Sequence, residues 1–151
     1  MFDLTGKHAF ITGGASGIGL AIAKRMGQAG AVITICDLQE PAGLDMAATF
    51  VRADVSDPES LANAFSDARG RSPINVLVNN AGINGEDGVV IEESNLELTQ
   101  RLFDVNALGV YHGLKYGPRY MEDGGSIINT ASLGATVVFP GSGPYSASKA
   151  S

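Results

Sequence analysis

Two groups of residues at opposite ends of this sequence have types and spacings that suit chemistry. Near the start, glycines recur in the turn Thr12-Gly13-Gly14-Ala15-Ser16-Gly17-Ile18-Gly19. At the other end, Tyr145 and Lys149 stand four residues apart, a spacing that places two side chains on one face of a helix. A free phenol is a poor base at neutral pH, but a nearby ammonium group stabilises its phenolate. The pair therefore suits proton transfer to a carbonyl oxygen.

The glycine-rich turn has the composition of a backbone that approaches phosphate closely. N–H groups at the start of a helix attract anions, and a Cβ at Gly13, Gly17 or Gly19 would block the approach or forbid the required φ. The spacing is Gly-x-x-x-Gly-x-Gly rather than the commoner Gly-x-Gly-x-x-Gly, and a tight structural turn is the alternative interpretation. We predict that this turn, with Ser16 and Ile18, holds the pyrophosphate of a dinucleotide.

The elements that must position these groups follow an alternating pattern. Apolar runs predict strands over residues 8–12, 31–37, 49–54, 75–79 and 126–130. Helices are expected over 17–29 and 38–48, after a cap at Ser56, and over 94–120 with strain near Gly109, Gly113 and Pro118; residues 133–144 are expected to form a loop. The alternation predicts an α/β fold, a doubly wound parallel sheet of the Rossmann type, with one domain over residues 1–151.

Each predicted strand ends in a polar or glycine-rich group. The glycine turn follows the first strand, Asp37 and Asp54 end the second and third, the run 79–82 ends the fourth, and Ser132 follows the fifth. Ligands bind beyond the carboxyl ends of such strands, so we expect these groups to meet at one site. Asp37 lies close to the ~20 residues beyond the glycines expected of a carboxylate that binds a ribose 2′-hydroxyl, although a helix cap is the alternative. A carboxylate at Asp37 that binds the ribose would repel the 2′-phosphate of NADP, so the sequence favours NAD over NADP.

Composition and charge narrow the classes of partner. Ten basic and sixteen acidic residues give a net charge of −6, and no basic stripe is present, so neither nucleic acid nor a membrane is an expected partner. The single cysteine, Cys36, is interpreted as a buried structural thiol. No signal peptide is evident, which leads us to expect a cytoplasmic protein. No metal site is expected: both histidines, His8 and His112, are interpreted as structural or surface groups, and the acidic residues Glu86, Asp87, Glu92 and Glu93 as a solvated loop.

Together the motifs resemble the short-chain dehydrogenase/reductase family, and the resemblance extends from Gly6 to Ser151. The matching residues, in chain order, are Thr12-Gly13-x-x-x-Gly17-x-Gly19, Asn79-Asn80-Ala81-Gly82, Asn106, Ser132 and Tyr145-x-x-x-Lys149. The resemblance implies four catalytic residues: Tyr145 as acid/base, Lys149 as the group that binds the nicotinamide ribose and tunes Tyr145, Ser132 as the partner of the reacting oxygen, and Asn106 as the holder of a relay water.

The resemblance also implies cofactor contacts outside the glycine turn. Asp54 and Val55 match the pair that contacts adenine, and Asn80, Ala81 and Gly82 match the segment that lines the cofactor site. Val137, Val138 and Phe139 line an apolar substrate pocket in one interpretation and are ordinary loop packing in the other.

The implied activity is an NAD(H)-dependent oxidoreductase that interconverts a secondary alcohol and a ketone. Family members continue past the Tyr-Lys helix, so we expect a dinucleotide-binding domain that is truncated after its fifth strand and incomplete at its C-terminal end. The helix carrying Tyr145 and Lys149 is then expected to be unformed, and the fifth strand to be an exposed edge that promotes a homo-oligomer. The alternative is a non-catalytic dinucleotide-binding fragment that acts through association.

Overall fold

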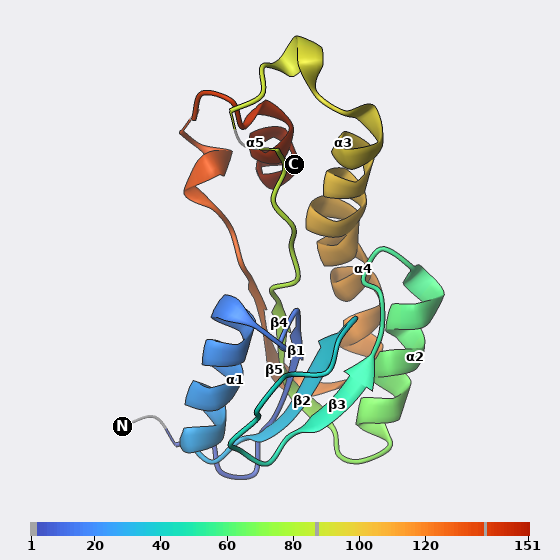
Figure 1. Ribbon diagram of the computed structural model, residues 1–151. Coiled ribbons are helices and arrows are strands. Elements are labelled where there is room, and N and C mark those ends of the chain that lie inside the picture. Colours follow the sequence, from blue (N-terminus) through green and yellow to red (C-terminus); the bar gives the residue numbers. More distant parts are fainter. Residues whose placement is uncertain (1–2, 87, 138) are drawn as a thin grey trace.

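A five-stranded parallel sheet forms the centre of the computed structural model, which describes residues 3–86, 88–137 and 139–151 (Figure 1). The strand order is β3-β2-β1-β4-β5, so the direction of winding reverses between β1 and β4. The strands are β1 (His8–Thr12), β2 (Val32–Asp37), β3 (Thr49–Arg52), β4 (Ile74–Asn79) and β5 (Met121–Asn129). This topology confirms the predicted doubly wound α/β fold, and the reversal is where such folds bind ligands.

Helices cover both faces of the sheet and extend past one end of it. They are α1 (Gly17–Gln28), α2 (Pro58–Arg69), α3 (Leu96–Phe103), α4 (Gly109–Tyr116) and α5 (Gly143–Ala150). Figure 1 shows α1 on one face, α2 and α4 on the other, and α3 and α5 beyond the carboxyl ends of the strands. Each face has its own apolar core, one centred on Phe10 and Phe65 and the other on Ile11 and Ile35. No helix in the described part of the chain is long and apolar enough to cross a membrane.

The long helix expected over residues 94–120 is divided into four parts. Between α3 and α4 lies a π-helical turn, Asp104–Leu108, and a 3₁₀ turn, Gly117–Tyr120, follows α4. The glycines of α4 allow close contacts with neighbouring residues and do not strain the helix. A Cβ on Gly109 would stand 2.8 Å from Val55, and one on Gly113 would collide with the side chain of Asn79. The absence of side chains at Gly109 and Gly113 lets α4 lie directly against Val55 and Asn79.

Two local predictions between β2 and α2 were wrong. The segment 38–48 forms turns instead of a helix, because Pro41 and Gly43, which has a φ of +62°, interrupt any run of helical hydrogen bonds. Asp57 rather than Ser56 caps α2, since its carboxylate accepts hydrogen bonds from the N–H groups of Glu59 and Ser60. Ser56 instead donates to Asp54.

The expectation that the Tyr145–Lys149 helix is unformed was also wrong. Helix α5 begins at Gly143 with Pro144 in its first turn, where the fixed φ and the missing N–H of proline cost nothing. It packs beside α3 and the π-helical turn, and Ser148 is buried in that contact. Tertiary packing therefore stabilises this segment as a helix.

Both histidines make hydrogen bonds to protein groups. His8 is buried at the base of the sheet, with Nε2 2.8 Å from the Thr34 hydroxyl and Nδ1 3.0 Å from the Ser72 carbonyl oxygen. Burial lowers the pKa of His8. The Nδ1 atom of His112 lies 2.9 Å from the carbonyl oxygen of Val55. Asp87 and Val138 lie outside the described residues.

The contact between α4 and β4 predicts that Gly113→Ala destabilises the protein. The added methyl group meets the buried Asn79 side chain, and overpacking of this kind costs about 1–3 kcal/mol. Gly70→Ala is the matched control, because its Cβ would have only ordinary contacts, at 3.5 Å or more, and its φ is −59°. Urea unfolding measures both variants. Equal stability of the two would mean that α4 does not need a bare backbone at Gly113.

Candidate active site

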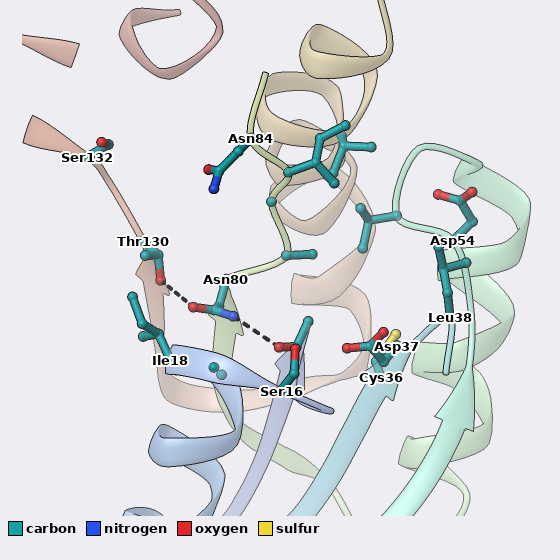
Figure 2. A pocket seen from close by; sticks show the side chains of 18 of the residues that line it. Ser16, Ile18, Cys36, Asp37, Leu38, Asp54, Asn80, Asn84, Thr130 and Ser132 are labelled. Carbon is teal, nitrogen blue, oxygen red and sulfur yellow. Dashed lines mark hydrogen bonds between the residues drawn. The ribbon is translucent and has the colours of Figure 1, made fainter. Parts of the chain in front are cut away.

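A cleft of about 570 Å³ opens at the carboxyl ends of the strands, across the reversal between β1 and β4 (Figure 2). Its size is typical of a small-molecule site. It is lined by fourteen of the fifteen site residues predicted from the sequence, namely Gly13, Ser16, Gly17, Ile18, Gly19, Asp37, Asp54, Val55, Asn80, Ala81, Gly82, Ser132, Tyr145 and Lys149. The fifteenth, Asn106, is buried behind the cleft wall.

The glycine-rich turn is pressed against the segment that follows β4. A Cβ on Gly13 would lie 2.7 Å from the Cα of Ala81, and one on Gly19 would overlap the carbonyl group of Gly13. Gly13 also has a φ of +63°, which other residues rarely adopt. These glycines are therefore required by close packing of the turn itself.

Asn80 connects the glycine turn to β5. Its Nδ2 atom donates to the carbonyl oxygens of Thr12 and Gly13, at 3.2 Å each, and its Oδ1 atom accepts from the Thr130 hydroxyl at 3.3 Å. Figure 2 shows the Asn80 side chain between Thr130 and the turn. The Thr12 hydroxyl accepts in turn from the N–H groups of Asn80 and Ala81. The three strand ends β1, β4 and β5 are thus fixed to one another where the cleft begins.

The predicted carboxylates lie on the cleft wall formed by the ends of β2 and β3. Asp37 accepts a hydrogen bond from the N–H of Ala15 at 3.0 Å, which ties it to the glycine turn. Asp54 accepts from the N–H and the hydroxyl of Ser56. Both side chains face the cleft beside Leu38 in Figure 2.

Tyr145 and Ser132 face each other at the other end of the cleft. The Tyr145 hydroxyl lies within hydrogen-bond distance of the Ser132 Oγ atom, at 3.2 Å, and Lys149 lines the same space one helical turn further along α5. A Cβ on Gly82 would stand 3.2 Å from the Nζ atom of Lys149 and 3.2 Å from the Oδ1 atom of Asn106. Gly82 therefore leaves the space that the ammonium group occupies.

Both polar atoms of the Asn106 side chain make hydrogen bonds within the protein. Its Oδ1 atom accepts from the N–H of Ile83, and its Nδ2 atom donates to the Ile83 carbonyl oxygen and to the Ser148 hydroxyl. The π-helical turn makes two successive residues, Val105 and Asn106, face inward together. The water-holding role that the family resemblance implies for Asn106 stays a prediction.

The cleft also contains residues that the sequence did not single out as site residues: Cys36, Leu38, Ala53, Ile83, Asn84, Arg101, Val105, Thr130 and Ala131. Thr130 follows β5 directly, so the rule that pointed to Asp37 and Asp54 could have found it. Arg101 lies one helical turn before Val105. Its place in the cleft could be predicted only once it was known which face of α3 points toward the cleft. Val137 and Phe139 are exposed and do not line the cleft.

Cys36 does not supply a nucleophile to this cleft. Its side chain is fully buried, and burial, with smaller contributions from Asp37 and Asp54, raises the pKa of the thiol to about 12. Because the thiolate is the reactive form, Cys36 is inert at neutral pH. This confirms its interpretation as a buried structural thiol.

The chain matches the family model described as short chain dehydrogenase over residues 7–151. It belongs to this family. Members of the family generally use a nicotinamide cofactor. The residues of the cleft fit such a group, because a Cβ on Gly17 would meet no protein atom within 4 Å and the bare backbone of α1 therefore faces open space at the helix N-terminus.

Relatives in sequence and in structure agree with this assignment. The chain is 40% identical over 157 residues to a 3-beta-hydroxysteroid dehydrogenase of Comamonas testosteroni, covering 97% of this chain and 60% of that protein. It is 37% identical to a mitochondrial borneol dehydrogenase of Lavandula x intermedia, covering 97% of this chain and 59% of that protein. The ligand-free structure of Thermoplasma acidophilum aldohexose dehydrogenase superimposes with a TM-score of 0.90 at 29% identity, covering 97% of this chain and 57% of that one. The chain thus spans about three fifths of the length of these short-chain dehydrogenases.

The open space in front of Gly17 predicts that Gly17→Ala weakens nucleotide binding. We expect a loss of at least tenfold in affinity for NADH, about 1.4 kcal/mol, because the methyl group enters the cleft. Gly43→Ala is the matched control. Gly43 has a similar φ, +62° against +51°, and no protein atom near its Cβ, but it lies outside the cleft. NADH fluorescence measures binding without interference, since the chain has no Trp. Equal affinity of the two variants would show that the nucleotide lies elsewhere.

Proposed function

We propose that this protein is an NAD(H)-dependent oxidoreductase that interconverts a secondary alcohol and a ketone by hydride transfer, with residues 1–151 as its dinucleotide-binding domain. The observation that carries the proposal is the Tyr145–Ser132 hydroxyl pair at 3.2 Å, with Lys149 in the same cleft. A helix with a purely structural role would not require two hydroxyl groups and an ammonium group to line the same cleft. The membership of a dehydrogenase family supports the same activity.

Tyr145 and Ser132 act on the oxygen of the substrate. In the direction of oxidation, the alcohol oxygen accepts a hydrogen bond from Ser132, and its proton passes to the Tyr145 oxygen as the C=O bond forms. In the direction of reduction, Tyr145 returns a proton to the same oxygen. The nicotinamide, when bound, accepts or supplies the hydride. Lys149 stabilises the deprotonated phenol through its positive charge and binds the ribose next to the nicotinamide.

The opposite half of the cleft binds the adenosine part of the cofactor. The glycine turn and the start of α1, with Ser16 and Ile18, bind the pyrophosphate, because these residues line the cleft at a helix N-terminus, where anions are favoured. Asp37 binds the ribose hydroxyls and repels a 2′-phosphate, and Asp54 and Val55 contact the adenine ring. Asn80, Ala81 and Gly82 form the floor between the two halves. Leu38, the neighbour of Asp37, brings no positive charge that would favour NADP.

The substrate is a small molecule with a secondary hydroxyl or keto group. Two relatives are named for a 3-beta-hydroxysteroid and for borneol, which supports an alcohol of this class. The alternative, a non-catalytic dinucleotide-binding fragment, is not favoured by relatives that are named as dehydrogenases. A homo-oligomer is supported by the exposed Leu108, Tyr111 and Leu114 on the α4 side of the molecule. A cytoplasmic location stays a prediction.

The proposed proton transfer predicts that Tyr145→Phe abolishes turnover and leaves the cofactor bound. Loss of an acid/base group costs about 10²–10⁴-fold in rate, while the ring itself stays in place. NADH oxidation with a panel of ketones measures turnover, and NADH fluorescence measures binding. Tyr116→Phe is the control, since Tyr116 belongs to the core cluster around Phe65 and lies outside the cleft. Turnover of Tyr145→Phe within tenfold of the parent would remove Tyr145 from the mechanism.

The position of Asp37 predicts tighter binding of NAD(H) than of NADP(H). Asp37→Asn keeps an oxygen that can accept from Ala15 but removes the negative charge, so the affinity for NADPH should rise about tenfold or more, or 1.4 kcal/mol, relative to NADH. Glu40→Gln removes an exposed charge three residues away that does not line the cleft, and it should leave the ratio unchanged. A parent protein that binds NADPH as tightly as NADH would contradict the preference.

A further inference from the structure

Ser148 is the one polar residue of α5 that is fully buried, although it lies between two residues that line the cleft. Its side chain is 1% exposed. The Ser148 hydroxyl accepts a hydrogen bond from the Nδ2 atom of Asn106 at 2.9 Å and donates one to the carbonyl oxygen of Tyr145 at 2.8 Å. A single hydroxyl thus connects the π-helical turn with the backbone of Tyr145.

The other end of this connection is fixed by the chain after β4. Asn106 holds both the N–H and the carbonyl oxygen of Ile83, at 2.8 and 3.0 Å, so its carboxamide cannot rotate without breaking two backbone hydrogen bonds. Asn106 is itself 5% exposed, where an unmade hydrogen bond costs most. A carboxamide held in this way presents its remaining N–H in one direction only, toward Ser148.

Helix α5 also contacts α3 and the 3₁₀ turn Leu133–Ala135, but these contacts bury no other residue of the helix. Its Ser142 cap makes no side-chain hydrogen bond, and Ser148 is the only buried residue within 143–150. Its other buried hydroxyl atom, the Oγ of Ser146, has no hydrogen-bond partner within the described part of the chain. The hydrogen bonds of Ser148 therefore link the rotation of α5 about its axis to the π-helical turn, and that rotation decides where Tyr145 and Lys149 point.

We propose that Ser148 is a positioning residue: through its hydrogen bonds to Asn106 and to the Tyr145 carbonyl oxygen it fixes the rotation of α5, and so sets Tyr145 against Ser132 and Lys149 beside Gly82. Ser148 itself touches neither substrate nor cofactor. The inference rests on the proposed function for its catalytic consequence, but the connection between Asn106 and α5 is independent of it. Because an error of about 1 Å in the position of a reacting group costs about 100-fold in rate, a loosened helix reduces turnover more than binding.

The test uses three variants of the full chain. Ser148→Ala removes both hydrogen bonds. Ser148→Thr restores them, because a helical threonine hydroxyl bonds the carbonyl oxygen one turn earlier as Ser148 does. Ser146→Ala is the matched control, since it removes a hydroxyl from the same helix that makes no hydrogen bond among the described residues. Each variant is measured for kcat, for KM, for NADH affinity, and for hydrogen exchange of the amides 143–150.

We expect Ser148→Ala to lower kcat at least tenfold, with KM and NADH affinity within twofold of the parent and faster exchange across 143–150. Ser148→Thr should recover kcat to within threefold, and Ser146→Ala should match the parent throughout. A Ser148→Ala protein with kcat within twofold of the parent would overturn the proposal. So would a loss of kcat that Ser148→Thr does not recover, because a general packing defect would then explain it.

A second readout separates this proposal from the proposed function. Tetranitromethane nitrates only phenolates that it can reach, and Cys36 is too deeply buried to react first. If the parent has no turnover, the proposed function fails, and the pH profile of Tyr145 nitration, followed by peptide mass, then decides the positioning role. A profile that is displaced in Ser148→Ala and restored in Ser148→Thr supports the role, and identical profiles in all four proteins refute it.

Discussion

The close contact between the glycine turn and the segment after β4 is the constraint on which the rest of the site depends. Gly13 lies so near Ala81 that no Cβ fits between them, and the hydroxyl of Thr12 and the amide of Asn80 join the two backbones from either side. This contact brings the start of α1 to the middle of the sheet, where the strand order reverses. A wider separation would move the N-terminus of α1 away from the floor of the cleft, and one ligand could no longer touch both.

A second set of contacts builds outward from that floor. Gly82 and Ile83 continue directly from the joined segment, and Asn106 holds Ile83 by both of its backbone groups. The residues proposed to carry out proton transfer are thus fixed to the same backbone segment that is proposed to bind the nucleotide. Lys149 reaches the floor at Gly82, whose missing side chain leaves room for the ammonium group. The two halves of the cleft are parts of one hydrogen-bonded unit, although they come from opposite ends of the sequence.

Much of the site could be predicted because parallel sheets gather strand ends at one edge. Asp37, Asp54 and Ser132 were found by position alone, and the structure places all three on the cleft. The helix predicted over 38–48 does not form, because Pro41 and Gly43 prevent a run of helical hydrogen bonds there. Arg101 was missed because a helix shows its inward face only after its neighbours are known. The partners of Asn106 were beyond sequence patterns for a related reason: they come from residues 23 and 42 positions away.

Helix α5 shows why local sequence rules were least reliable where the proposed catalytic residues lie. The segment is helical because it is held from outside, by burial of Ser148 and by the carboxamide of Asn106. Support of this kind has a functional consequence, since a helix that relies on its neighbours takes its rotation from them. Tyr145 meets Ser132 at 3.2 Å on a helix that contacts both the π-helical turn and the 3₁₀ turn Leu133–Ala135, which directly follows Ser132.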